Sequence, residues 1–558
     1  MRNALVLAVL LNVVSLSAQT VDVAPATPAA RVVRSVVDGA RLDEMYIASF
    51  GAYADDVRNF YGPAGYRLAW TRDGRPTPQA LALINLFENA DAKALRPFDY
   101  DGSRWQARLT SLRGDDALAR FDVAMTAATM RYVSDVRLGR VHPQSVRFGF
   151  DVDSKVVYLP AVVSQAATAA DAAAVLAQSE PQSGEYRRLL PALAAWRRIA
   201  AESANEAPLP VVAKLAAGGT YDALPQLAAK LRRFGDLAAD AKVEGTSYEG
   251  AIVDAVKHFQ SRHGLAADGV ISSKTFAALN VPAAQRVRQL ELAVERARWT
   301  PELDAAASIV VNIPEFRLEA RGAETLAMRV VVGKAAGHQT PVFDGDIKHV
   351  VFRPYWAVPP SIQRGEIVPK LVKDRGYLAR NNFEVVTDSG RSLGSGVSDD
   401  TLSKLRTFQY SIRQKPGASN ALGLMKFLFP NDNNVYLHST PQQALFARDR
   451  RDFSHGCIRI EDPVALAAWV LRNDPQWSEA KIRAAIKSDK DDMYVKLVQP
   501  IPVVIQYTTA VVRANGEVNF FEDIYGHDTR LMAMLETGVN VPQEKVLVAS
   551  AAPQKAVR

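Results

Sequence analysis

The sequence of 558 residues predicts a multidomain α+β protein with an N-terminal helical scaffold, a small helical module and a mainly-β C-terminal domain that contains an inserted lid. Two observations lead to this prediction. The chain is long enough for three or four domains, at roughly 100–200 residues per domain. Apolar residues recur every three or four positions up to about residue 240, whereas apolar and polar residues alternate after about residue 300. The first period is typical of amphipathic helices and the second of half-buried strands.

The first residues are expected to direct export. Residues 1–18 contain Arg2, an apolar run from Ala4 to Val14 and then small side chains, which is typical of a secretory signal peptide. The run is shorter than the roughly 20 residues that span a bilayer, so an uncleaved anchor is the alternative, and no transmembrane segment is expected after signal cleavage. Residues 19–37 are rich in Ala, Pro, Val and Thr and predict a flexible lead-in.

Two helical regions follow. Residues 38–240 contain apolar stripes such as Phe121, Met125, Ala128 and Tyr132, which predict the packed core of a helical scaffold domain. Residues 241–285 predict a separate small module, in which an apolar helix face is closed by a glycine and followed by a second short helix.

Residues 300–535 are expected to form the mainly-β domain, and residues 536–558 a disordered tail. Alternation or β-rich composition predicts strands at the following ranges: 308–318, 328–332, 349–358, 434–438, 503–512 and 518–521. The polar, partly helical block 366–422 interrupts these strands and predicts an inserted lid, since functional loops commonly lie on rigid scaffolds. Asp462 and Pro463 predict a helix start, with Asp as N-cap and Pro at the first helical position.

Composition narrows the possible partners. The net charge of +7 is spread along the chain without a basic block, so nucleic acid is not an expected partner. The sequence has no CxxC, no HExxH and no acidic calcium loop, so neither a metal nor a cofactor is expected.

The single cysteine, Cys457, is the first candidate for chemistry. A lone cysteine is often a small buried hydrophobe. Here it follows Ser454, His455 and Gly456 and precedes Ile458-Arg459, a polar setting that does not suit a dry core. In an oxidising compartment structural cysteines normally come in pairs, so an unpaired one indicates a reactive thiol or an intermolecular disulfide.

A cysteine nucleophile needs a base, a group that orients the base, and donors for an oxyanion. His438 can serve as the base if its strand end lies beside the thiol, with the Ser439 carbonyl orienting the ring, and His455 is the rival for that role. The backbone amides of Gly456 and Cys457 are candidate oxyanion donors.

Two further side chains are candidates for substrate binding. Tyr436 lies two residues before His438, so both project from the same strand face. Arg459 suits a substrate carboxylate, and the alternative is a structural ion pair.

At these residues the chain resembles a known family. The stretch from His438 to Arg459, with Ser-His-Gly-Cys-Ile-Arg at its end, resembles the signature of L,D-transpeptidases with a YkuD-type catalytic domain. Further segments resemble the large YcbB-like branch, which joins a helical scaffold, a peptidoglycan-binding module and a lidded catalytic domain: Val332-Gly333-Lys334, Thr340-Pro341-Val342-Phe343, Pro354 to Pro359 with Trp356, Arg413 to Gly417, Asn420 to Gly423, and Phe429-Pro430-Asn431.

The resemblance implies a specific reaction. Such enzymes attack the L-centre carbonyl of meso-diaminopimelate in a donor tetrapeptide stem, release D-Ala, and pass the acyl group to the side-chain amine of another stem, forming a 3→3 cross-link. It implies Cys457 as nucleophile, His438 as base oriented by Ser439, and His455, Gly456 and Cys457 around the oxyanion site. Trp356, at the entry to the lid, is expected to bind substrate together with Tyr436 and Arg459.

The module also resembles a family. Residues 255–260 with Gly264-Leu265 and Asp268-Gly269-Val270 are similar to the small peptidoglycan-binding module of many wall enzymes, although Ser272 stands where that family usually has Gly. The alternative is a helical spacer without affinity for glycan.

Three classes of function remain open from the sequence. The first is a transpeptidase that acts on peptidoglycan stems in the periplasm of a Gram-negative-type envelope. The second is a hydrolase on the same fold, either an L,D-carboxypeptidase or an enzyme that releases wall-attached lipoprotein. The third is an inactive peptidoglycan-binding scaffold.

Overall fold

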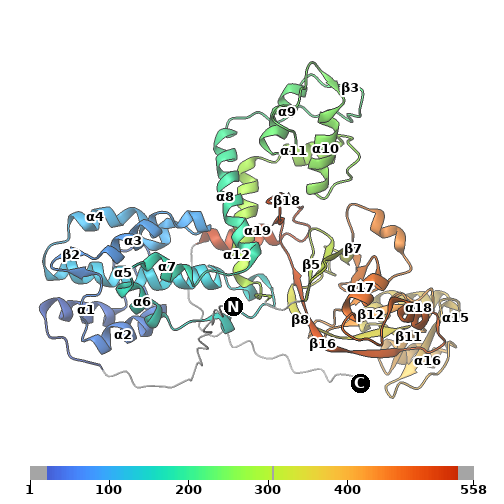
Figure 1. Ribbon diagram of the computed structural model, residues 1–558. Coiled ribbons are helices and arrows are strands. Elements are labelled where there is room, and N and C mark those ends of the chain that lie inside the picture. The colour runs from blue at the N-terminus through green and yellow to red at the C-terminus, as the bar shows by residue number, and fades with distance from the viewer. Residues whose placement is uncertain (1–21, 304–306, 538–558) are drawn as a thin grey trace, which may run out of the picture.

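The computed structural model describes residues 22–303 and 307–537. Figure 1 shows a helical domain on one side, a sheet-rich domain on the other, and a smaller module joined to them by two long helices. The expected signal peptide (residues 1–18) and residues 538–558 of the expected tail lie outside the described residues. The arrangement agrees with the predicted multidomain α+β class.

The N-terminal domain is built from seven helices around one core that includes the buried side chains of Trp70 and Trp105. These helices and a short hairpin are α1 (Pro28–Gly39), α2 (Ala54–Tyr61), β1 (Thr71–Arg72), β2 (Arg75–Pro76), α3 (Pro78–Glu88), α4 (Trp105–Thr110), α5 (Gly114–Leu138), α6 (Leu159–Thr168) and α7 (Ala172–Ala177).

Helix α1 corrects the expected flexible lead-in over residues 19–37. The Thr27 side chain accepts a hydrogen bond from the Ala30 amide, and Pro28 stands in the first turn. These are start signals for a helix, and Val33 and Val37 are then fully buried against the domain core. The capping signal and the apolar spacing outweigh the loop-like composition of this segment.

Two long helices join the module to the rest of the chain. Helix α8 (Gly184–Glu202) leads from the N-terminal domain into the module, and α12 (Ala283–Trp299) leads from the module to the sheet-rich domain. The two helices share an apolar core. The module contains β3 (Gly219–Thr220), α9 (Leu224–Arg233), β4 (Ser247–Tyr248), α10 (Ala251–Arg262) and α11 (Ser273–Leu279).

The core of the module begins earlier than the predicted boundary at residue 241. It runs from Leu209 to Leu279 and includes Leu227 and Leu231 of α9. Helix α9 has the same amphipathic pattern as the scaffold helices, so its packing with α10 and α11 could not be predicted from the pattern. The module is defined below as residues 209–279.

The sheet-rich domain is organised around a nine-stranded sheet with the order β14-β7-β15-β13-β12-β8-β16-β5-β6. Because β6 also pairs with β7, the sheet closes on itself. Its strands are β5 (Ser308–Asn312), β6 (Arg317–Arg321), β7 (Leu326–Gly333), β8 (Phe343–Phe352), β12 (Met425–Leu428), β13 (Leu437–His438), β14 (Asp452–Ser454), β15 (Ile458–Ile460) and β16 (Met493–Gln506).

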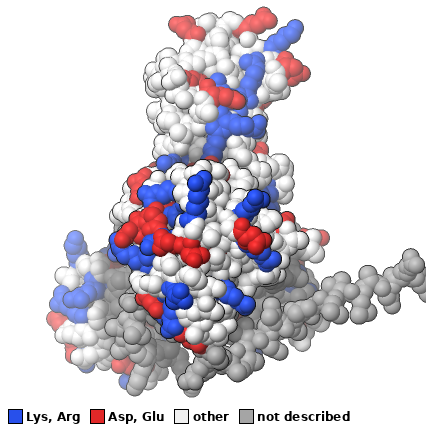
Figure 2. Space-filling model, turned by 90° about the vertical axis from the view of Figure 1, so that its left-hand side faces the viewer, with Lys and Arg blue, Asp and Glu red and all other residues white. Residues whose placement is uncertain are grey.

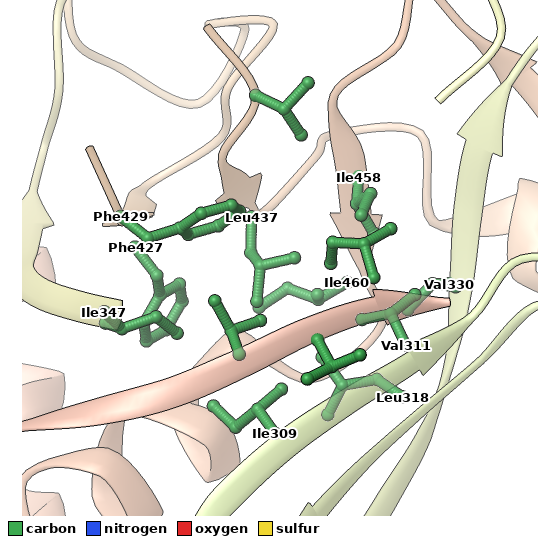
Figure 3. Packing of buried hydrophobic residues seen from close by; sticks show 14 of the residues in the cluster. Ile309, Val311, Leu318, Val330, Ile347, Phe427, Phe429, Leu437, Ile458 and Ile460 are labelled. Carbon is green, nitrogen blue, oxygen red and sulfur yellow. The ribbon is translucent and has the colours of Figure 1, made fainter. Parts of the chain in front are cut away.

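Alternation along these strands fills the interior of the closed sheet with aliphatic and aromatic side chains, as Figure 3 shows. The expected single strand 308–318 is instead two strands, because the chain turns around Pro314 and Phe316 takes a positive φ of 55°. The turn is followed by a strand that pairs back on β5.

The lid is a subdomain with its own apolar core, and that core extends beyond the predicted range 366–422. It starts at β9 (Trp356–Ala357) and ends at β11 (Tyr410–Gln414), which pair with each other. The elements between them are α13 (Pro360–Ile362), the π-helical segment η8 (Gln363–Ile367), α14 (Val368–Lys373), α15 (Tyr377–Arg380), β10 (Phe383–Thr387) and α16 (Asp399–Arg406). We use "lid" below for residues 356–414.

The C-terminal part of the expected domain 300–535 returns to the helical region. Helices α17 (Pro463–Val470) and α18 (Glu479–Lys487) pack on the sheet. In contrast, β17 (Ala510–Val512) and β18 (Val518–Phe520) form a hairpin whose apolar residues pack on α8 and α12. Helix α19 (His527–Thr537) follows, and Leu535 accepts a hydrogen bond from Arg140.

Charges of both signs lie side by side on the face shown in Figure 2. Within residues 22–303 and 307–537, no helix combines the length and the apolarity that crossing a bilayer requires.

Candidate functional site

Two neighbouring strands bring together four of the predicted site residues. β13 and β15 are parallel, and their register pairs His438 with Arg459. Tyr436 and His438 are two residues apart, as are Cys457 and Arg459, so each pair projects to one face of the sheet. The residues between them point to the opposite face and fill the core. The thiol, the imidazole, the phenol and the guanidinium are thereby placed on one side of the sheet.

His438 has a fixed tautomer. Its Nδ1 lies 2.6 Å from the carbonyl oxygen of Ser439. A carbonyl only accepts, so Nδ1 carries the hydrogen and Nε2 keeps a free lone pair. The ring is 4% exposed, and burial together with the charge of Arg459 lowers the pKa of His438 to about 3. The imidazole is therefore neutral at physiological pH.

Ser439 is itself held firmly. Its hydroxyl donates to the Leu422 carbonyl at 3.0 Å and accepts from the amides of Leu424 and Met425 at 2.7 and 3.1 Å. The turn that makes these contacts contains Gly423, whose φ is +63°, and a Cβ there would overlap with the Ser439 hydroxyl. The prediction that Ser439 orients the base through its carbonyl agrees with this geometry.

Cys457 is partly exposed, and its Sγ lies 3.8 Å from the carbonyl oxygen of Asn434. Burial raises the pKa of the thiol, while hydrogen bonds from the amide and hydroxyl of Tyr436 and the charge of Arg459 act in the opposite direction. The net direction is upward, so the thiol, like the imidazole, is neutral at rest. The two groups form a neutral pair instead of a thiolate–imidazolium pair.

The loop before the thiol is fixed by hydroxyl groups. Gly456 has a φ of +117°, a region that favours glycine. Its amide donates to Ser454 Oγ at 3.1 Å, and the same hydroxyl donates to the Cys457 carbonyl at 2.6 Å. Thr340 Oγ1 donates to the Gly456 carbonyl at 2.7 Å, and the Tyr525 hydroxyl accepts from the Thr340 amide at 3.2 Å.

This network changes the expectation for the oxyanion donors. Of the two predicted amides, that of Gly456 is already bound to Ser454. In the part of the chain that the structure describes, no acceptor takes the Cys457 amide hydrogen. The Cys457 amide is therefore the better placed of the two for an oxyanion.

His455 is joined to the lid. Its Nε2 lies 2.5 Å from a carboxylate oxygen of Glu366 in η8, and its ring packs edge-on against His338 with the ring centres 4.5 Å apart. Among the described residues, no hydrogen bond joins the thiol to a ring nitrogen of His455 or of His438. His438 shares the sheet face of Cys457 and has its Nδ1 bound to a carbonyl, whereas Nε2 of His455 is already bound to Glu366. His438 is therefore the better candidate of the two for the base.

Arg459 is not part of an ion pair among the described residues. Its Nη1 donates to the Gln442 side chain at 2.6 Å, and its buried Nε has no partner. Burial lowers the pKa of Arg459, and the nearby thiol opposes this effect. The structural ion pair that the sequence left open is absent here, and the guanidinium can still accept a carboxylate.

Tyr436 contacts both the thiol and the imidazole. Its ring meets that of His438 edge-on with the centres 5.8 Å apart. Burial and the adjacent Cys457 raise the pKa of the phenol, so it is a hydrogen-bond donor at physiological pH.

Trp356 was expected to bind substrate, and the structure gives it a different environment. It pairs with Gln414 in the lid sheet and packs against Phe383 with the ring centres 6.0 Å apart. Its contacts belong to the core of the lid, not to the strand face with the thiol.

Sequence reasoning missed the roles of Thr340, Tyr525, Glu366 and Gln442. Thr340 stood in a segment that resembled the family, but nothing showed that its hydroxyl supports the loop of Cys457. Glu366 lies 89 residues from its partner His455 in the sequence. Gln442 lies 17 residues from its partner Arg459. Sequence spacing does not reveal either contact. Among the described residues, no three His, Cys, Asp or Glu side chains form a group that could hold a metal ion.

A thiol, a neutral imidazole oriented by a carbonyl, and an unpaired guanidinium on one sheet face are the parts of a cysteine-dependent acyl-transfer site. Comparison with known families agrees with this class. The family "L,D-transpeptidase catalytic domain" (YkuD) matches residues 306–486, "Putative peptidoglycan binding domain" matches residues 220–279, and "Scaffold domain" matches residues 55–193. The chain carries the YkuD-type L,D-transpeptidase catalytic domain together with a domain of the peptidoglycan-binding family.

One curated relative is similar to this chain in sequence. A relative from Haemophilus influenzae described as "Putative L,D-transpeptidase" is 32% identical over 246 residues, which cover 44% of this chain and 49% of that protein. The chain thus matches about half the length of this curated relative. A solved structure of an L,D-transpeptidase from Xylanimonas cellulosilytica (residues 123–326) is 14% identical, with a TM-score of 0.18. The matched region includes 53% of this chain and 99% of the chain in that structure.

Proposed function

We propose that this protein is a peptidoglycan L,D-transpeptidase that forms 3→3 cross-links through an acyl-enzyme on Cys457. The observation that supports this most is the register of β13 and β15, which sets His438 and Arg459 side by side, with Cys457 and Tyr436 on the same face. The family of the catalytic domain supports the reaction type.

The first half-reaction takes the acyl group from the donor stem. The Cys457 sulfur attacks the L-centre carbonyl carbon of meso-diaminopimelate, and its proton moves to Nε2 of His438. The C–S bond forms and the carbonyl oxygen becomes an oxyanion. This tetrahedral intermediate then collapses: the bond to the D-Ala nitrogen breaks, and the imidazolium gives its proton to the departing amine. A thioester and free D-Ala result, and His438 is neutral again.

The second half-reaction regenerates the thiol. The side-chain amine of an acceptor diaminopimelate attacks the thioester carbonyl, and His438 takes one proton from that nitrogen. The C–S bond breaks, the new amide is the 3→3 link, and the proton returns to sulfur. A base that is neutral at rest suits both steps, because it must accept a proton each time.

Backbone and side-chain donors stabilise the intermediates. The free Cys457 amide is directed at the developing oxyanion, where one donor is typically worth about 3 kcal/mol. Arg459 binds a carboxylate of the donor stem by its planar fork. The Tyr436 hydroxyl donates to the sulfur and disperses its charge when the proton has left.

The lid controls access to the thioester on Cys457. Glu366 of the lid contacts His455, two residues before the nucleophile, so lid position and the nucleophile loop are connected. We propose that the lid closes over the donor stem and excludes water from the thioester, which favours the amine acceptor over hydrolysis.

The cellular setting follows from the same proposal. The substrates are peptidoglycan stem peptides on glycan, and the protein is exported to the periplasm by the segment 1–18. The peptidoglycan-binding family match at residues 220–279 supports this partner.

Product analysis tests the proposal. The whole chain is incubated with purified disaccharide-tetrapeptide, and the products are weighed by mass spectrometry. Cross-linked dimers with release of D-Ala are expected, and the Cys457→Ala variant should leave the substrate unchanged. Tripeptides alone would assign a carboxypeptidase, and an unchanged substrate with the unmodified protein would overturn the enzymatic proposal.

A further inference from the structure

A cavity of about 840 Å³ lies where the module meets the sheet-rich domain. The module contributes Leu265 and Lys274, the sheet-rich domain contributes Phe316 and Arg451, and Phe521 after β18 lines it as well. Figure 1 shows β18 at the foot of the module, close to this junction. The volume is in the range of ligand sites, roughly 300–1,000 Å³. Cys457 is not among the residues that line it.

The lining is strongly cationic. It contains seven Lys or Arg side chains but only three acidic ones. Four of these cations are neutralised by ion pairs with carboxylates: Arg317, Arg329, Arg450 and Arg513. The remaining three, Lys274, Arg286 and Arg451, have no carboxylate within ion-pair distance among the described residues.

Arg286 is the most informative of these three. Its side chain is 7% exposed, yet its only partners are neutral: the Gln289 side chain at 2.8 Å and the Ala278 carbonyl at 3.1 Å. Its guanidinium lies 4.9 Å from the ring centre of Phe520. Burial and the nearby Arg262 lower the pKa of Arg286 to about 9. Buried charges are normally paired, so this one indicates a missing anion.

Arg451 lines the same cavity from the sheet-rich domain, whereas Arg286 lies on α12. Arg451 donates to four carbonyls, those of Phe316, Val330, Asp449 and Arg448, at 3.1, 3.2, 3.3 and 2.5 Å. Its guanidinium lies 5.2 Å from the Phe316 ring centre. Burial lowers the pKa of Arg451 to about 10. Both arginines are bound only to neutral groups among the described residues, so the cavity carries positive charge that an anion can neutralise.

The charge of the lining determines what kind of ligand fits. Phe316 and Phe521 line the cavity but are each only 6% exposed, so they offer little aromatic surface to a ligand. The three cations without a carboxylate partner are the feature that a ligand can use. A glycan strand with peptide stems supplies the matching anion, because its stems end in carboxylates.

We propose that this interdomain cavity, defined by Lys274, Arg286 and Arg451, is a second peptidoglycan site that binds a stem carboxylate, separate from the thiol. This inference rests on the proposed function for its choice of ligand. Binding across the junction fixes the module against the sheet-rich domain while a stem occupies the catalytic site. Because the cationic lining recognises a carboxylate, the site should bind only glycan strands that carry peptide stems.

A binding experiment tests this independently of catalysis. The whole chain with Cys457→Ala is titrated with fluorescently labelled, uncross-linked glycan strands that carry tetrapeptide stems, and separately with strands from which an amidase has removed the stems. Stem-bearing strands should bind at least ~10-fold tighter than strands without stems, because each stem carboxylate adds a few charge-assisted contacts. Equal affinity for both strands would overturn the proposal.

Variants locate the site. Arg286→Gln and Arg451→Gln should each weaken binding of stem-bearing strands ~10-fold, and Lys274→Gln ~3-fold, because a lost ion pair is worth more when it is buried. Lys214→Gln removes an equally exposed lysine of the module outside the cavity and should change nothing. Lys274 is exposed, so its variant folds even if Arg286→Gln does not.

The outcomes separate this inference from the catalytic proposal. If stem-bearing strands bind with these variant effects but no products form, the cavity stands and the transpeptidase proposal fails. If products form but Lys274→Gln and Arg451→Gln bind such strands as tightly as Lys214→Gln, the cavity proposal is wrong and the catalytic one stands.

Discussion

The Nδ1 hydrogen of His438 points at the carbonyl oxygen of Ser439, 2.6 Å away. This contact decides which nitrogen can act as a base, because it leaves the Nε2 lone pair free. It also connects the base to the turn 420–424, since the Ser439 hydroxyl is bound by Leu422, Leu424 and Met425. The orientation of the base therefore depends on a segment distant from the cysteine in sequence.

The two histidines should differ in how they affect the acylation rate. His438→Ala should lower the rate by about 10²- to 10⁴-fold, as is typical when a general base is lost. It should also move the pH–rate profile towards that of an unassisted thiol, whose pKa burial raises above the free value of about 8.5. His455→Ala should keep the native profile, because His455 contacts the lid. The assignment fails if the shift appears in the His455 variant and the His438 variant keeps the native profile.

The resting Cys457 side chain should be a protonated, neutral thiol at physiological pH. Burial raises the pKa of Cys457 and lowers that of His438 to about 3, so neither shift favours a thiolate–imidazolium pair. The rate of alkylation by iodoacetamide should therefore rise throughout pH 6–9, with a midpoint above that of a free thiol at about 8.5. A plateau reached at pH 6–7 would reveal a preformed thiolate and contradict the neutral pair.

Breaking the contact between Glu366 and His455 should affect substrate capture. Glu366→Gln keeps the size of the side chain and removes its charge, so KM for the donor stem should rise while alkylation of Cys457 by iodoacetamide stays the same. Glu366 is 44% exposed, so a double-mutant cycle with His455→Ala should give a coupling of only about 0.2–1 kcal/mol. Additive effects of the two changes would show that the contact does not link lid and loop.

Gly423 should be required for the base as well as for stability. In Gly423→Ala the new Cβ would overlap with the Ser439 hydroxyl and lie 2.8 Å from the Thr440 amide, and the left-handed backbone adds roughly 1–2 kcal/mol of strain. Both the free energy of unfolding and the acylation rate should fall. Gly218 also has a positive φ, but nothing lies within 4 Å of a Cβ built there.

Gly218→Ala is therefore the matched control: it carries the backbone strain without the clash. It should lose stability in a urea titration yet acylate normally. If Gly423→Ala acylates at the rate of the control, the Ser439 contact does not determine the function of His438.

The parts of the site that the sequence predicted are those close to the cysteine motif. Cys457, Arg459, His438 and Tyr436 follow from strand alternation and from the family signature, and the register of β13 and β15 brings them together. The contact between His455 and the lid could not be predicted, because its partner Glu366 lies 89 residues away in the sequence. The engagement of the Gly456 amide by Ser454 was equally hidden, since it depends on a local rotamer.

The type of structure in each region, helical or sheet-rich, was predicted more reliably than the residues at which the domains begin and end. Composition favoured a flexible segment before residue 38, but a capped helix begins at Pro28 because burial of its apolar stripe outweighs composition. The module boundary at residue 241 was late because α9 has the periodicity of the scaffold helices. The pairing of Trp356 with Gln414 in the lid sheet could not be predicted, because it joins residues far apart in the sequence.

The central claim is that the acyl group is carried by Cys457, and trapping the intermediate tests it most directly. The protein is mixed with a donor tetrapeptide stem in the absence of an acceptor, quenched in acid, digested and mapped by mass spectrometry. A thioester adduct of the donor without its D-Ala is predicted on the peptide that contains Cys457, with no adduct in Cys457→Ala. An adduct on any other residue, or D-Ala release that persists in Cys457→Ala, would contradict the account.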